Sequence, residues 1–243
     1  MLIKLVCFDL DNTLWPVDPV IARAEEQTWR WLAERAPELA AGRDIEALRA
    51  IRLGLLRSRP EYAHNLTALR RDAMAVAFMQ AGLTEPAARD LAAAAMAVFL
   101  EHRNAVTFFP GARELLEALA GRYRLAALTN GNADLARIGA DHLFDVVLSS
   151  ESVGRAKPDP AMFRRALADT GVAARDALHV GDHPEQDVLA ARRHGLGAVW
   201  ANPLRLPRPS SLPDDVPAFE DYNELECLLG EFGDRETPAG GSS

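Results

Sequence analysis

The pattern of hydrophobic and polar positions divides the chain into stretches of different texture. An apolar run over 3–8 is typical of a buried strand. From about 18 to 104 no strand-like run follows, and segments rich in alanine, leucine, glutamate and arginine are broken by proline and glycine. This stretch predicts four helices, over about 18–36, 43–57, 61–81 and 85–104, the last with Thr84 as its N-cap.

Beyond about residue 106, short apolar runs alternate with helical segments. The strand candidates lie in YRLAALTN, FDVVLSS, ALHVGD and GAVWAN. Such strands, separated by helices, indicate a parallel sheet that is covered by helices on both faces. We therefore predict an α/β core over 1–15 and 106–220, an inserted all-helical domain over 16–105, and a C-terminal helix with a disordered tail over 221–243.

Composition and net charge limit the kinds of binding partner and the cellular location that we expect. The chain has 243 residues and a formal net charge of -8, which argues against nucleic acid or an anionic membrane as a partner. Only Cys7 and Cys227 are available for disulfides, so a cytoplasmic protein is expected. Asp9 and Asp11 interrupt any signal-peptide pattern, and the longest apolar run, 91–100, is shorter than the roughly 20 residues that span a bilayer. No feature indicates an oligomeric state.

The residues with chemical potential come directly after the predicted strands. Ligands of open α/β sheets bind beyond the carboxyl ends of the strands, so these residues are expected to meet at one edge. They are Asp9 and Asp11 after the first strand, Thr129, Asn130 and Gly131 after the second, Lys157 after the third, and Asp182 and Asp187 after the fourth.

This set favours phosphoryl transfer. Clustered carboxylates need a counter-ion, and oxygen ligands suit Mg²⁺, which Asp9 and Asp182 could share. Asp9 could attack phosphorus and form an aspartyl phosphate, while Asp11, on roughly the same side of the backbone, could protonate the leaving alkoxide. Thr129, Asn130 and Lys157 are expected to bind the phosphoryl group and to balance its charge.

Four ordered motifs carry a resemblance to a known family. DLDNTL, LTN, the lysine of AKPDP, and GDHPEQD resemble the motifs of the haloacid dehalogenase (HAD) superfamily, and the likeness extends to about residue 205. It implies a Rossmann-like core with a mobile helical cap of the C1 type. It also implies Asp9 as nucleophile, Asp11 as general acid and base, Mg²⁺ held by Asp9, Asp182 and the Asp11 carbonyl, and Asp187 as the residue that orients the metal site.

Several reactions within the superfamily stay open. The dehalogenases lack an acid at the position of Asp11, because a halide leaves without a proton, so a 2-haloacid dehalogenase is less favoured. Sugar phosphomutases keep both acids and remain an alternative. A non-enzymatic interaction protein ranks last, because all four motifs are intact. We expect a Mg²⁺-dependent phosphomonoester hydrolase that acts on a small phosphorylated metabolite through an aspartyl phosphate.

The resemblance extends to the substrate. PEYAHNLTALRRDAM, FFPGARELLEALAGRYRLAALTNGNADL and LHVGDHPEQDV are similar to the bacterial FMN phosphatases, which also dephosphorylate a ribitylaminouracil phosphate. FMN or a ribityl phosphate is therefore the expected substrate. His64, Thr67 and Arg71 fall at i, i+3 and i+7, one face of a predicted helix, so His64 and Arg71 are candidates for specificity, although the pattern by itself favours a solvated helical face over substrate contact.

Overall fold

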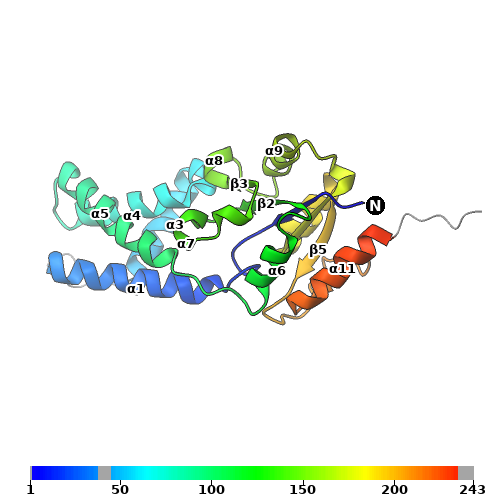
Figure 1. Ribbon diagram of the computed structural model, residues 1–243. Helices are drawn as coiled ribbons and strands as arrows, with labels where there is room; N and C mark the ends of the chain where they lie inside the picture. Colours follow the sequence, from blue (N-terminus) through cyan, green and yellow to red (C-terminus); the bar gives the residue numbers. More distant parts are fainter. Residues whose placement is uncertain (1, 38–44, 235–243) are drawn as a thin grey trace, which may run out of the picture. The chain divides into compact units, whose positions relative to one another are not determined.

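The structure, a computed structural model, describes residues 2–37 and 45–234 (Figure 1). Its contacts divide the chain into two compact units. We call them the core unit and the helical unit and describe each by itself. The core unit contains the chain up to Pro16, Thr107–Gly131, and the chain from Gly139 onward, and the helical unit contains Val17–Val106 and Asn132–Ile138.

The core unit is built on a parallel sheet. The strand order is β3-β2-β1-β4-β5-β6, and each neighbouring pair is parallel, which confirms the predicted sheet. In the register, Phe8 of the central strand β1 is paired with Ala127 on one side and with Val180 on the other. The strands are β1 Leu5–Phe8, β2 Arg124–Thr129, β3 Val146–Ser149, β4 Ala177–Gly181, β5 Gly197–Ala201 and β6 Ala218–Phe219.

Helices cover both faces of this sheet, as predicted for a Rossmann-like fold. Figure 1 shows α9 on one side of the strands and α6 with α11 on the other. On one face, Leu5 and Cys7 of β1 join a buried cluster with Met162 and Phe163 of α9. Every residue of β1 is buried, which explains its unbroken apolar run. The helices of the core unit are α6 Ala112–Leu119, η2 Asp141–Leu143, α8 Ser150–Val153, α9 Ala161–Thr170, η3 Ala174–Asp176, η4 Pro184–Leu189, α10 Ala190–Arg193 and α11 Tyr222–Asp234.

Most of the helical unit is the insert between β1 and α6. Among the described residues of this insert, 17–37 and 45–106, there is no strand, which confirms the all-helical prediction. Leu32, Met74, Phe78 and Phe99 belong to its buried apolar cluster. No helix in the described part of the chain is long and apolar enough to cross a membrane. The helices are α1 Val17–Arg35, α3 Ile45–Ser58, η1 Pro60–His64, α4 Leu66–Gln80, α5 Glu85–Arg103 and α7 Leu135–Ile138.

Two helix predictions were wrong in detail. The single helix predicted over 61–81 is divided at Asn65, whose side chain accepts a hydrogen bond from the Ala68 N–H at 2.8 Å and so begins α4. His64 therefore ends η1 and does not share a face of α4 with Thr67 and Arg71. Thr84 precedes α5 as predicted, but its side chain makes no capping hydrogen bond. The predicted helix start at 43 and the predicted tail beyond 234 lie outside the described residues.

The short segment 132–138 packs with the helical unit, although its sequence position follows β2. The Asp134 N–H donates to Asn104 Oδ1 at 2.8 Å, and Arg103 Nε donates to Asn132 Oδ1 at 3.1 Å. Arg103 and Asn104 are both buried at the end of α5. The partners of two buried polar side chains, rather than chain order, thus determine where this segment lies.

Candidate active site

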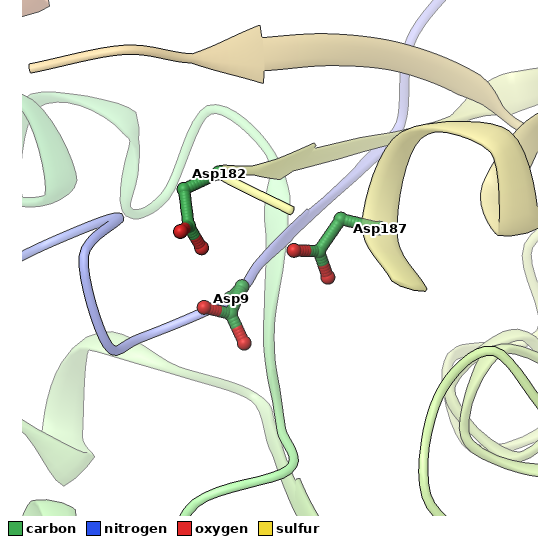
Figure 2. A group of neighbouring side chains, drawn as sticks. All are labelled: Asp9, Asp182 and Asp187. Atoms are coloured by element: carbon green, nitrogen blue, oxygen red, sulfur yellow. The ribbon is translucent and has the colours of Figure 1, made fainter. Parts of the chain in front are cut away.

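Three carboxylates converge at the carboxyl ends of β1 and β4 (Figure 2). Asp9 follows β1, Asp182 follows β4, and Asp187 comes from η4. One oxygen from each lies within 4.8 Å of the others. Because β1 leads to β2 on one side and β4 returns on the other, this is the point of an open sheet where the strand order reverses and ligands bind.

Lys157 is the buried cation of this cluster. Its Nζ donates to Asp9 Oδ1 at 2.8 Å, to Asp187 Oδ1 at 2.6 Å and to the Leu128 carbonyl oxygen at 2.6 Å. Burial alone would lower the pKa of Lys157, but the charges of Asp187 and Asp9 outweigh it and hold that pKa above its usual range. All three ammonium hydrogens have protein acceptors, so Lys157 fixes Asp9 in place.

Asp187 serves as an anchor for its neighbours. Oδ1 accepts from Lys157 and lies 3.0 Å from His179 Nε2, and Oδ2 accepts from the His183 N–H at 3.0 Å. Burial would raise the pKa of Asp187, but Lys157 and His179 hold it well below its usual range. Burial lowers the pKa of His179, so its neutral ring donates from Nε2. Since both oxygens are occupied by donors, the geometry suits an orienting role.

Gly181 allows Asp187 to approach the end of β4. A Cβ atom added at Gly181 would lie 2.4 Å from Asp187 Cγ, a distance that no real contact allows. The following turn is stabilised locally, because His183 Nδ1 accepts from the backbone N–H groups of Glu185 and Gln186 at 3.2 Å each. Any side chain at 181 would displace the carboxylate that anchors Lys157.

The positive charge of Lys157 does not fully balance the carboxylates of Asp9 and Asp182. Burial raises the pKa of Asp9 well above its ordinary value, and Asp187 and Asp182 act in the same direction against Lys157. Burial and the charge of Asp187 raise the pKa of Asp182 to about 7. A hard divalent cation that prefers oxygen ligands would favour the ionised form of both carboxyl groups and so lower both pKa values. Asp9 and Asp182 are therefore the carboxylates that fit a metal ion.

Thr13 connects the ends of β1 and β4. Its hydroxyl accepts from the Asp182 N–H at 3.0 Å and lies 3.4 Å from both Asp9 Oδ2 and Asp182 Oδ1. Thr13 is fully buried. Its hydroxyl can donate to only one of the two carboxylates at a time. Sequence reasoning did not single out Thr13, although its place within DLDNTL offered a signal.

Asp11 is not one of the three carboxylates whose oxygens lie within 4.8 Å of one another. Its Oδ1 accepts from Trp15 Nε1 at 2.9 Å. The turn between them is closed by a hydrogen bond of 2.7 Å from the Asn12 N–H to the Trp15 carbonyl oxygen, and Asn12 adopts a φ of 59°, which asparagine tolerates. Asp11, which was predicted to lie beside Asp9, is therefore also bound to Trp15, a residue to which the sequence analysis assigns no role.

Thr129 and Asn130 lie at the end of β2, as predicted. The Thr129 hydroxyl accepts from the Gly131 N–H at 2.9 Å, and it still has its own hydrogen to donate. Asn130 Oδ1 accepts from the Lys157 N–H at 2.7 Å, and Nδ2 donates to the Lys157 carbonyl at 2.9 Å and to Gln186 at 2.8 Å. The Asn130 side chain thus holds the Lys157 backbone, and its contact with phosphate stays a prediction.

Trp200 is a further residue at this edge that sequence reasoning missed. Its Nε1 donates to the Asp182 carbonyl oxygen at 2.8 Å. With Asn12, Asp182 and Asn202 it lines a small hollow in the core unit. Trp200 is buried at the end of β5, so the position of Asp182 depends on two neighbouring strands.

His64 and Arg71 belong to the helical unit. Arg71 Nε donates to Asp72 Oδ1 at 2.9 Å, and Asp72 Oδ2 accepts from the Tyr62 hydroxyl at 2.6 Å. The Arg71 side chain is exposed and His64 is half-buried. The role of both residues in specificity stays a prediction.

Comparison with known proteins places these features in context. The family model for haloacid dehalogenase-like hydrolases matches residues 3–195. The 5-amino-6-(5-phospho-D-ribitylamino)uracil phosphatase YigB of Escherichia coli (strain K12) is 33% identical over 201 residues, which cover 83% of this chain and 84% of that protein. A phosphoserine phosphatase of Thermus thermophilus is 42% identical over 145 residues, 57% of each chain.

A solved structure is also similar over nearly the whole chain. It is described as a 2-haloacid dehalogenase from Pseudomonas syringae pv. Tomato DC3000. Its TM-score is 0.88 at 39% sequence identity, and the alignment covers 95% of this chain and 100% of that one. The similar proteins thus carry both phosphatase and dehalogenase descriptions.

Proposed function

Because this chain belongs to the haloacid dehalogenase-like hydrolases, we propose that it is a Mg²⁺-dependent phosphomonoester hydrolase that works through an aspartyl phosphate on Asp9. One observation carries the proposal: the Asp9 carboxylate is buried, held by Lys157 at 2.8 Å, and placed beside a second carboxylate, Asp182, whose negative charge is not balanced. A nucleophile that is fixed in place and accompanied by a cation site is what attack on a phosphoryl group requires.

The metal site would be made of oxygen ligands. Asp9, Asp182 and the backbone carbonyl of Asp11 would hold Mg²⁺, and Asp187 would keep Lys157 and the η4 turn in position. When bound, Mg²⁺ supplies positive charge next to the phosphoryl oxygens. A cation held by this ligand set would also lower the raised pKa values of the two buried carboxyl groups, Asp9 and Asp182.

In the first chemical step, an Asp9 carboxylate oxygen attacks phosphorus, and the bond between phosphorus and the ester oxygen breaks. Asp11 gives a proton to the departing alkoxide. In the second step, Asp11 accepts a proton from water, the water oxygen attacks phosphorus, and the bond to Asp9 breaks. The products are an alcohol, inorganic phosphate and the regenerated Asp9 carboxylate. Thr129 would donate its hydroxyl hydrogen to a phosphoryl oxygen in both steps.

The dehalogenase description of a similar structure makes halide release the main alternative. Asp11 argues against it, because a halide leaves without a proton and has no use for an acid at this position. The unbalanced charge of Asp182 argues in the same direction, since it favours a cation. A phosphomutase keeps both acids, and it would differ by requiring a bisphosphate activator and releasing little phosphate.

For the substrate we propose FMN or a related ribityl phosphate. The support is the identity of 33% to the E. coli ribitylaminouracil phosphatase over 84% of its length. The helical unit would act as a C1 cap that excludes water during the reaction, with His64 and Arg71 as candidates for contact with the leaving group. We further propose a cytoplasmic location, which fits two free cysteines, one buried and one exposed.

The test is a panel of phosphate-release and halide-release assays with Mg²⁺. FMN, sugar phosphates, phosphoserine and 2-chloropropionate are compared for the native chain, Asp9→Asn, and a surface control, Asp214→Asn, at an exposed site. We expect phosphate release that prefers FMN, loss of turnover in Asp9→Asn, and native rates in Asp214→Asn. Chloride release without phosphate release would overturn the proposal, and so would unchanged turnover in Asp9→Asn.

A further inference from the structure

Tyr222 connects the C-terminal helix to the turn that follows β1. It is the first residue of α11, its side chain is buried, and its hydroxyl donates a hydrogen bond to the backbone carbonyl oxygen of Thr13. Burial and the negative charge of Asp182 raise the pKa of this hydroxyl, so it keeps its hydrogen at neutral pH. Tyr222 lies beyond residue 195, where the family match ends, so the match itself gives it no role.

The Tyr222 ring is held in place by its neighbours. It lies nearly edge-on to Phe219 of β6, with ring centroids 5.1 Å apart. Its Cβ also lies close to Gly111 before α6, where an added Cβ atom would be 3.4 Å away and where a φ of 81° favours glycine. A ring that is packed on two sides turns its hydroxyl away only by disturbing β6 or the start of α6. The donor is therefore aimed at Thr13 before any ligand binds.

Thr13 relates this contact to the ends of both central strands. While its carbonyl oxygen accepts from Tyr222, its hydroxyl accepts from the Asp182 N–H at 3.0 Å. The Asp182 carbonyl oxygen in turn accepts from Trp200 Nε1 at 2.8 Å. Consecutive hydrogen bonds thus connect α11 to β5 through the ends of β1 and β4. Side chains from the last part of the core unit hold both backbone segments beside the carboxylate cluster.

One proposed metal ligand, the Asp11 carbonyl, is a backbone group and moves only with its turn. Within the turn 10–14, the Leu14 N–H donates to the Leu10 carbonyl oxygen at 2.7 Å. The Tyr222 hydroxyl holds the same turn from outside, two residues beyond Asp11. Removal of a group that holds a metal ligand commonly changes metal affinity or activity by roughly 10–100-fold. The Tyr222 hydroxyl is therefore placed to affect metal affinity.

A purely structural role would explain the burial of the Tyr222 ring but not its acceptor. A buried phenol needs a hydrogen-bond partner, and any buried carbonyl oxygen would satisfy it. Here the acceptor belongs to Thr13, whose hydroxyl lies 3.4 Å from both Asp9 Oδ2 and Asp182 Oδ1. The two roles predict different results. Loss of the Tyr222 hydroxyl would lower only the stability of the fold in the first case, and would also lower metal affinity in the second.

We propose that Tyr222 is a positioning residue for the metal site, whose hydroxyl holds the Thr13 backbone and thereby the Asp11 carbonyl oxygen. The same bond keeps the Thr13 hydroxyl on the Asp182 N–H. This role rests on the proposed function, because it requires the Mg²⁺ site described there. Tyr222 itself would touch neither the metal ion nor the substrate.

Tyr222→Phe tests this role, since it keeps the ring and removes only the hydroxyl. Mg²⁺ binding is measured by calorimetry on the full chain without substrate, and we expect the Kd to rise about tenfold. Tyr62→Phe is the matched control, because Tyr62 is also buried and its hydroxyl donates to Asp72 Oδ2 at 2.6 Å within the helical unit. It should leave the Kd unchanged. Equal affinity in the native chain and Tyr222→Phe would overturn the role of Tyr222, and so would equal weakening by the control.

Turnover of p-nitrophenyl phosphate gives a readout that a merely structural role would not move. We expect Tyr222→Phe to approach the native kcat once Mg²⁺ is raised about tenfold, because the metal site is weakened rather than removed. A loss of kcat that persists at saturating Mg²⁺ would overturn the role of Tyr222. Absence of Mg²⁺ binding by the native chain would overturn the proposed metal site as well, whereas equal Mg²⁺ affinity in both proteins would overturn the role of Tyr222 alone.

A measurement on the native chain decides the matter if Tyr222→Phe does not fold. The chain has 3 tyrosines, Tyr62, Tyr123 and Tyr222, so labelling with 3-fluorotyrosine gives one fluorine NMR signal for each. Tyr62→Phe and Tyr123→Phe identify the Tyr222 signal by elimination. Because coupling between two sites is reciprocal, Mg²⁺ must affect Tyr222 if Tyr222 affects Mg²⁺. We expect Mg²⁺ to shift the Tyr222 signal and not the Tyr62 signal, and an unshifted Tyr222 signal would contradict the proposal.

Discussion

Trp15 Nε1 donates a hydrogen bond to Asp11 Oδ1 at 2.9 Å, so a buried indole fixes the orientation of the proposed general acid. Trp15 is fully buried and lies edge-on to Phe108, with ring centroids 5.1 Å apart. The Asn12 N–H closes the same turn on the Trp15 carbonyl at 2.7 Å. The position of the acid thus depends on a side chain that does not itself react.

Trp15→Phe tests this dependence. The change keeps an aromatic ring in the core but removes the N–H donor, so Asp11 is less well oriented for proton delivery. We expect kcat to fall about tenfold for an alkyl phosphate, which needs protonation, and to fall less for p-nitrophenyl phosphate. Trp31→Phe, in the helical unit, is the matched control and should leave the ratio of the two rates unchanged. Equal losses on both substrates would show that Trp15 only packs.

Lys157→Met tests the central ion cluster. The change leaves Asp9 and Asp187 without their shared cation, and breaking a buried pair in this way costs about 3–5 kcal/mol. Urea unfolding measures the loss. Lys4→Met is the control, because Lys4 pairs with Asp176 while 54% exposed, and such a pair contributes about 1 kcal/mol or less. Similar losses in both variants would contradict the description of Lys157 as the key counter-charge.

Gly181→Ala tests the close approach of Asp187 to β4. The added Cβ would lie 2.4 Å from Asp187 Cγ, so Asp187 must move away from Lys157 and His179. We expect a loss of activity and a lower thermal midpoint. Gly54→Ala, in α3, is the control, because a Cβ there meets nothing within 4 Å. It should be neutral or slightly stabilising, since alanine favours a helix. Native activity in Gly181→Ala would contradict this account of the end of β4.

The raised pKa of Asp182 predicts how stability depends on pH. In metal-free protein the folded-state pKa is about 7, above the ordinary value of 3.8, so the protonated carboxyl stabilises the fold. That contribution is complete below the ordinary pKa and is lost as pH rises through about 7. Relative to Asp182→Asn, the native chain in chelator should therefore lose thermal stability between about pH 5 and pH 7.5.

Mg²⁺ should reverse this loss, because it binds the ionised carboxylate. We expect the thermal shift caused by Mg²⁺ to grow as pH rises toward about 7.5 and to be small in Asp182→Asn. The comparison between the two proteins removes the opposite effect of His179, whose pKa is lowered by burial and which both proteins share. A stability difference that stays constant with pH would contradict the assignment of the raised pKa to Asp182.

The sequence was sufficient to predict the parallel sheet, because its strands are continuous apolar runs, and to predict which residues follow each strand. Asp9, Lys157, Asp182 and Asp187 meet because parallel strands bring their carboxyl ends to one edge. Local rules of this kind do not identify partners from distant segments. Nothing near Asn130 in the sequence indicates that its side chain holds the Lys157 backbone.

Local competition explains the errors in the helical unit. The periodicity of 61–81 favours one helix, but the Asn65 side chain competes for the backbone and begins α4 anew, which removes His64 from the predicted face. Trp15 and Trp200 both resemble ordinary core residues in the sequence. Their roles depend on one N–H group each, and only the positions of Asp11 and Asp182 in space show where those groups point.

The most direct test of Asp9 as the nucleophile is to trap the covalent intermediate. The native chain is mixed with Mg²⁺ and phosphate-labelled p-nitrophenyl phosphate, quenched in acid, and mapped by peptide mass spectrometry, with Asp9→Asn as the control. We expect label on the peptide that contains Asp9, formed and lost within turnover, and none in Asp9→Asn. Release of labelled phosphate without a labelled Asp9, or label on another residue, would contradict the assignment of Asp9 as the nucleophile.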